Sequence, residues 1–220
     1  MMYAILNGNL TGFTLLAFVL GYILAVMLAI IFHEVSHAFV AYKFGDPTPK
    51  FTGRLTFNPA KHFEMFGFLS FLIIGFGWAK PVMINPLNFR NFNKGRRFVA
   101  ISGIVTNIVL CIVFSCLAFF LSPLLISASN AFCDLIYFFI NYSCIINLAL
   151  AIYNLLPIYP LDGYNFLRTF LRPENGFVQV MEKYGSLILF VFILTPFFSW
   201  FYNFTINGVI GGLNMFWGLF

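Results

Sequence analysis

Long apolar stretches separated by short polar connections make up most of this chain. Four stretches are long enough to cross a bilayer as helices, over about 13–44, 98–121, 132–156 and 186–204. A fifth, 63–77, is too short to cross and ends in glycines, which suits a segment that enters the membrane and returns. The pattern predicts an all-α polytopic membrane protein: a bundle of about four to six transmembrane helices, with a re-entrant or extended membrane-associated segment between the first two long spans.

Composition agrees with this prediction. The 220 residues are 61% hydrophobic and only 9% charged, whereas a soluble domain has about 25% charged residues. The net charge of +5 comes from Lys and Arg in the polar connections, so we explain it by orientation in the membrane and expect no nucleic-acid partner. We expect a single domain over 1–220, with a functional core over about 13–170 and a C-terminal helix and tail over about 184–220.

The first long span carries the string His33-Glu34-Val35-Ser36-His37 near its C-terminal end. On a helix the two histidines lie one turn apart on the same face, a spacing at which two neutral imidazoles can hold one Zn²⁺. Glu34 need not be a ligand and can take a proton from the attacking water. An acidic side chain at membrane depth costs roughly 2.5–3.5 kcal/mol on insertion scales. We therefore favour a functional site over two histidines that only bond neighbouring helices.

A hydrolytic zinc site typically has a third protein ligand, and the candidates are Asp162, His62, Glu64 and Asp134. We favour Asp162 because it follows a span that ends in proline, where the backbone is irregular and a carboxylate can turn inward. The alternative role for Asp162 is to cap a helix over 164–171, and both roles can hold if each oxygen serves one of them. His62 is interpreted as a loop histidine, and Glu64 and Asp134 are interpreted as interfacial carboxylates.

Other polar residues leave alternatives open. Asn147 and Asn154 are seven residues apart and share one face of their helix near the proposed ligand. Hydrogen bonding between helices and contact with a substrate explain these amides equally well. Lys80 beside Trp78 is typical of an anchor at the membrane interface. The four cysteines form no C-x-x-C pair and are interpreted as buried small side chains.

The metal site constrains the topology. The two histidines lie at the end of the first span and Asp162 lies just past the end of another, so both ends must be on one side of the membrane. An even number of crossings separates them, and 98–121 and 132–156 already supply two. The segment 63–77 must therefore return to the side from which it enters. Connections on that side carry the basic residues, which places the metal site toward the cytoplasm.

These residues resemble the site-2 protease family of intramembrane zinc metalloproteases, in its minimal prokaryotic form without a PDZ domain. The resemblance is carried by the H-E-x-x-H string, by 77–82, by Gly103 with Asn107, and by 154–163. It implies one Zn²⁺ per chain, with Glu34 as the catalytic residue and three zinc ligands, His33, His37 and Asp162. We expect substrate contacts at five positions, Asn154, Asn147, Asn107, Lys80 and Val82.

The resemblance also implies a function. The protein would hydrolyse peptide bonds in or near the transmembrane segments of membrane-protein substrates, as a multi-pass protein of the prokaryotic cell membrane. Its partners would be those substrates and the lipid bilayer, and a second copy of the chain or a separate regulatory membrane protein remains open. Two alternatives come from other classes: a membrane metal-ion transporter, and a catalytically silent binder of transmembrane helices. The intact Glu34 argues against the silent binder, which needs no proton acceptor.

Overall fold

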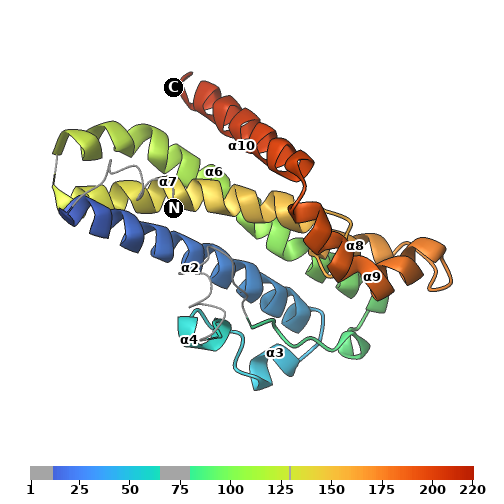
Figure 1. Ribbon diagram of the computed structural model, residues 1–220. Coiled ribbons are helices and arrows are strands. Elements are labelled where there is room, and N and C mark those ends of the chain that lie inside the picture. Colours follow the sequence, from blue (N-terminus) through green and yellow to red (C-terminus); the bar gives the residue numbers. More distant parts are fainter. Residues whose placement is uncertain (1–11, 65–79, 129) are drawn as a thin grey trace.

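The computed structural model describes residues 12–64, 80–128 and 130–220, and every regular element within them is a helix (Figure 1). Four of these helices, α2, α6, α7 and α9, are long and apolar enough to cross a membrane. The predicted all-α, multi-pass fold is confirmed, while the expected re-entrant segment 63–77 lies largely outside the described residues. In chain order the elements are α2 (Gly12–Lys43), α3 (Thr48–Phe51), α4 (Pro59–His62), the 3₁₀ helix η1 (Pro86–Asn88), α6 (Phe92–Ala128), α7 (Ala131–Leu155), α8 (Asp162–Arg168), α9 (Gly176–Ile193) and α10 (Pro196–Trp217).

Helices α2, α6 and α7 lie side by side and form the core of the molecule (Figure 1). Small residues on α2 allow its neighbours to approach closely. Ala25 and Ala29 are fully buried, and a Cβ atom on Gly21 would lie 2.9 Å from the Cβ atom of Phe138 on α7. Membrane helices associate through such close contacts, because apolar side chains gain little by leaving lipid. The packing fixes the rotation of α2 and therefore the direction in which its histidines project.

A sharp reversal after α7 brings Asp162 back to the bundle. Helix α7 ends at Leu155, and α8 begins at Asp162 after an extended N-cap residue, Leu161. The next residue, Gly163, packs so closely on the end of α7 that a Cβ atom there would overlap the Leu155 carbonyl oxygen. Only glycine fits this approach. Asp162 thus lies beside the last turns of α2, as the count of crossings predicts.

The C-terminal part differs from the prediction of one span over 186–204. Helix α9 ends before this stretch is complete, and α10 begins at Pro196. Proline suits the first turn of a helix because its missing N–H has no partner there. The Thr195 hydroxyl caps the new helix by accepting a hydrogen bond from the Phe198 backbone N–H at 3.2 Å. Helix α10 then packs along α6 and α7, where its Ile206 joins a buried apolar cluster.

Candidate metal centre

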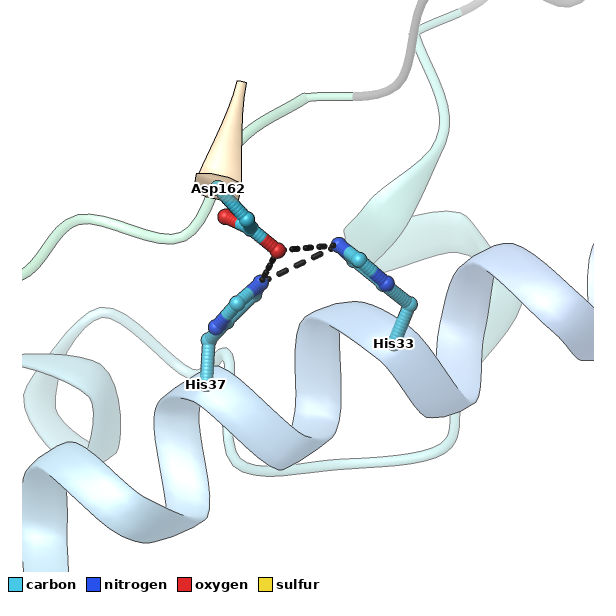
Figure 2. A group of neighbouring side chains, drawn as sticks. All are labelled: His33, His37 and Asp162. Carbon is cyan, nitrogen blue, oxygen red and sulfur yellow. Dashed lines mark hydrogen bonds and ion pairs between the residues drawn. The ribbon is translucent and has the colours of Figure 1, made fainter. Parts of the chain in front are cut away.

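Three side chains from distant parts of the chain point toward one another near the end of α2 (Figure 2). His33 and His37 come from successive turns of α2, and Asp162 is the first residue of α8. The Asp162 Oδ2 atom lies 3.2 Å from His33 Nε2 and 3.1 Å from His37 Nε2, and the two Nε2 atoms are 3.1 Å apart. Both imidazoles are only 8% exposed. The structure therefore brings together the three ligands expected from the sequence.

The outer nitrogens of both imidazoles are held by carbonyl oxygens. His33 Nδ1 lies 2.6 Å from Asn107 Oδ1, and His37 Nδ1 lies 2.8 Å from the Val99 carbonyl oxygen. Because a carbonyl oxygen only accepts hydrogen bonds, each Nδ1 carries a proton, and in the neutral imidazole each Nε2 then presents a lone pair. Asn107 is itself oriented by its Nδ2 group, which donates to Asn147 Oδ1 at 2.8 Å.

The donor set fits a zinc ion. Two imidazole lone pairs and one carboxylate oxygen converge, and all three atoms lie within 4.8 Å of one another. The Asp162 Oδ2 atom is buried and faces the two Nε2 atoms, which have no proton to donate to it when both rings are neutral and protonated at Nδ1. In that state all three facing atoms are acceptors, and a cation bound between them stabilises the arrangement. Two histidines and one carboxylate are a common ligand set for catalytic zinc, and they leave a fourth position for water or substrate.

Helix α6 supplies both the space for His33 and its hydrogen-bond acceptor. A Cβ atom on Gly103 would overlap the His33 ring, so the imidazole occupies the volume that a side chain would fill. Asn107 lies one turn further along α6 and accepts from the same ring. Asn147 on α7 completes the group, and both asparagines are fully buried. The three core helices therefore meet at one zinc-facing imidazole.

We expect the substitution Asn107→Leu to weaken zinc binding by about 10–100-fold, because removing the group that orients a metal-ligating histidine typically has this effect. The measurement is zinc retention by the purified chain in titrations with a competing chelator. The control is Asn141→Leu, which removes an α7 asparagine bonded to Ser122 and Tyr137 instead. Equal losses in the two variants would contradict a specific role for Asn107 toward His33.

Glu34 lies next to the three-residue group and faces the chain segment that precedes α6. Its Oε2 atom accepts a hydrogen bond from the Val82 backbone N–H at 3.1 Å. Residues 80–85 form no helix, as the prolines at 81 and 86 predict. Pro81, Val82 and Ile84 border the site, and burial alternates along 81–86 as it does in an extended chain. The hydrogen bond fixes the direction of the Glu34 carboxylate.

A buried carboxylate, Asp46, anchors this segment to the end of α2. It accepts hydrogen bonds from the Asn85 backbone N–H at 2.7 Å and from the Asn88 side-chain amide at 2.8 Å. The Thr48 hydroxyl and backbone N–H donate to it at 2.6 and 3.1 Å. Burial raises the pKa of Asp46, but these hydrogen bonds outweigh it and bring the pKa below its ordinary value. Asp46 is therefore ionised at neutral pH and holds the segment in place.

A cleft of about 450 Å³ lies beside the three candidate ligands. Among the residues expected from the sequence, its walls include the three ligands, Glu34, Val82 and Asn154. Asn107 and Asn147 do not line it, because the faces of α6 and α7 that carry them point into the bundle, where their amides serve His33. The Lys80 side chain is exposed and lies outside the lining, while its carbonyl oxygen accepts from Arg54.

The structure also places two of the other ligand candidates, His62 and Asp134. His62 is buried, and its Nε2 atom lies 2.6 Å from the Thr56 carbonyl oxygen. Asp134 lies in the first turn of α7 and accepts a hydrogen bond from the Thr14 hydroxyl at 3.1 Å. Neither belongs to the three-residue group. Asp162 makes no side-chain cap to α8, whose N-cap is Leu161, so the capping alternative is not realised.

The sequence analysis did not predict two groups that help to hold the site together. The Val99 carbonyl oxygen orients His37, and a backbone acceptor has no signature in the residue type. Asp46 follows a glycine and precedes a proline, a pattern that indicates only the end of a helix. Three polar residues bond to Asp46 in the structure, Thr48, Asn85 and Asn88. Their presence in the sequence is the signal that could have indicated a buried carboxylate, because such a group needs several donors.

Comparisons with known proteins identify relatives of this chain. A family model described as peptidase family M50 matches residues 21–196, which include all three candidate ligands. "Putative zinc metalloprotease YwhC" of Bacillus subtilis is 37% identical over 186 residues, covering 81% of this chain and 82% of the relative. "Putative zinc metalloprotease Rip2" of Mycolicibacterium smegmatis is 29% identical over 222 residues, covering 87% of this chain and 78% of the relative. No solved structure matches the chain.

Proposed function

The chain belongs to peptidase family M50, the site-2 protease family, and is a zinc metalloprotease by that membership; from this premise we propose that it hydrolyses peptide bonds in or beside transmembrane segments of other membrane proteins. One observation carries the proposal. Two imidazoles and a carboxylate converge beside Glu34 in a cleft that lies among helices apolar enough to cross a membrane. A substrate helix would have to unwind there, because its carbonyl groups are bonded internally.

We assign the chemical steps to the residues that line the cleft. His33, His37 and Asp162 would hold the zinc ion, which polarises the scissile carbonyl group and lowers the pKa of water. Glu34 would take a proton from the attacking water and deliver it to the leaving amine as the C–N bond breaks. The water oxygen ends in the new carboxyl group. The Val82 N–H would keep the Glu34 carboxylate directed into the cleft.

Substrate binding would use the other walls of the cleft. Val82 and Ile84 lie on an extended segment, so the unwound substrate strand could pair along it through backbone hydrogen bonds. Asn154 faces the cleft from the last turn of α7, where its Nδ2 group donates to the Leu150 carbonyl at 3.0 Å. This bond leaves the Asn154 carbonyl oxygen directed elsewhere, and we assign it to a substrate N–H group.

We also propose that the site faces the cytoplasm of a bacterial cell. The basic residues gather in the connections at the end of the bundle that carries the site, on both sides of the extended segment and around α8. The turn between α6 and α7, at the opposite end, carries no Lys or Arg. Cytoplasmic loops of membrane proteins have this excess of positive charge.

The experiment is incubation of the detergent-purified full chain with synthetic single-span peptides of different sequence. We expect cleavage of at least one peptide, loss of cleavage when a zinc chelator is added, and recovery when zinc is restored. Cleavage within or next to the apolar segment supports the proposal. Cleavage that survives complete zinc removal, or no cleavage of any peptide by the zinc-loaded chain, would overturn it.

A further inference from the structure

Arg96 lies on the face of α6 that holds the metal centre, and it lines the cleft. It is one turn before Val99, whose carbonyl oxygen orients His37, and two turns before Gly103, against which His33 packs. Seven residues of helix place its Cα atom about 10 Å from that of Gly103. Extended chain rises about 3.3 Å per residue, so this distance corresponds to about three residues of an unwound substrate.

Arg96 differs from the other buried or half-buried arginines in its partners. Arg54 donates to backbone carbonyls, Arg97 donates to the Thr169 hydroxyl at 3.2 Å, and Arg168 pairs with the Glu182 carboxylate. The Arg96 guanidinium lies over the Phe92 ring, 5.3 Å from its centre, and no oxygen acceptor among the described residues is within hydrogen-bond distance of it.

Arg96 is half-buried, so the lack of a hydrogen-bond acceptor among the described residues leaves part of its desolvation free energy uncompensated. A guanidinium that is partly removed from water and donates no hydrogen bond loses solvation, which a carboxylate beyond hydrogen-bond distance repays only in part. Arg168 adds a second positive charge nearby, and the adjacent carboxylate, Glu182, is already engaged by it. The N–H groups of Arg96 are therefore available to donate hydrogen bonds to an anion that enters the cleft.

We infer that Arg96 is a specificity-determining residue that binds the carboxylate of an aspartate or glutamate in the substrate, within about four residues of the scissile bond. The inference rests on the proposed protease function. Arginine is suited to this task because its planar fork of N–H groups matches a carboxylate with two parallel hydrogen bonds. The substrate segment that leaves the metal centre along α6 passes this side chain.

The test uses a library of peptides from a digested proteome, incubated with the purified, zinc-loaded full chain. Mass spectrometry of the products gives the residues that flank each cleavage site. We expect Asp and Glu to be enriched at one position within four residues of the cleaved bond. For a matched Glu and Gln peptide pair, kcat/KM should favour Glu by about tenfold or more.

Variants of two neighbouring arginines sharpen the test. Arg96→Ala should remove the acidic preference, Arg96→Glu should replace it with a preference for Lys and Arg, and Arg96→Lys should retain part of it. Arg97→Ala is the matched control, because it removes the same charge from the adjacent residue of α6, which lies outside the cleft lining. Zinc content checks that each variant is folded.

The outcomes separate the inference from the function on which it rests. Cleavage without acidic enrichment, or enrichment that survives Arg96→Ala, would overturn the role of Arg96 and leave the protease function intact. A uniform fall in cleavage of acidic and neutral peptides in Arg96→Ala would make Arg96 structural and would also overturn it. If the zinc-loaded wild-type chain cleaves no peptide, both the function and the inference fail.

Discussion

Replacement of Glu34 by glutamine should lower peptide cleavage by about 10²–10⁴-fold while zinc stays bound. General acid–base groups contribute factors of this size, and an amide cannot accept the proton that the carboxylate would take. Glutamine has the same shape, and its carbonyl oxygen can still accept the hydrogen bond that the Val82 N–H donates at 3.1 Å. Cleavage rates and zinc content of the purified variant, measured side by side, check this prediction.

The control for this variant is Glu174→Gln, which makes the same change at an exposed position in the connection between α8 and α9. We expect wild-type cleavage and wild-type zinc content from it. Cleavage by Glu34→Gln at more than a tenth of the wild-type rate would contradict the assignment of Glu34 as the proton carrier. Metal-ion transport that persists in Glu34→Gln while cleavage is absent in the wild type would favour a transporter.

The second large effect concerns Asp162. Asp162→Ala should abolish both zinc retention and cleavage, because two imidazoles alone do not complete the three-ligand set of a catalytic zinc site. The helix that follows should survive, since the Asp162 side chain makes no cap hydrogen bond to α8. The measurement is zinc content after dialysis against a weak chelator, with circular dichroism to confirm that helix content is unchanged.

Asp134→Ala is the matched control for this variant. Its carboxylate lies on α7 and bonds to Thr14, near the start of α2, at the opposite end of that helix from the metal centre. We expect full zinc content and full cleavage. Zinc retained at the wild-type level by Asp162→Ala would remove this residue from the ligand set.

The parts of the site that the sequence predicts depend on regular geometry. The helical repeat places His33 and His37 on one face of α2, and the count of crossings brings Asp162 to the same end of the bundle. These inferences need only the helix period and the lengths of the apolar stretches. The extended course of 80–85 follows likewise from two prolines.

The rest depends on the rotation of each helix about its axis, which packing decides. Asn107 and Asn147 are polar residues in apolar helices, and sequence alone does not say whether such an amide faces a substrate or a neighbouring helix. The structure turns both inward, where Asn107 bonds to His33 and Asn147 bonds to Asn107. Pro196 illustrates a second limit: it begins α10, although an uninterrupted apolar stretch suggests a single span there. Composition does not distinguish a long helix from two helices that a first-turn proline separates.

The central claim is that α2 and α8 together bind one zinc ion. X-ray absorption at the zinc edge of the purified full chain tests it most directly. We predict about one zinc per chain, with nitrogen and oxygen ligands at about 2.0–2.1 Å and a two-imidazole signature. A zinc-free protein after careful purification, or sulfur ligands at about 2.3 Å, would contradict the claim.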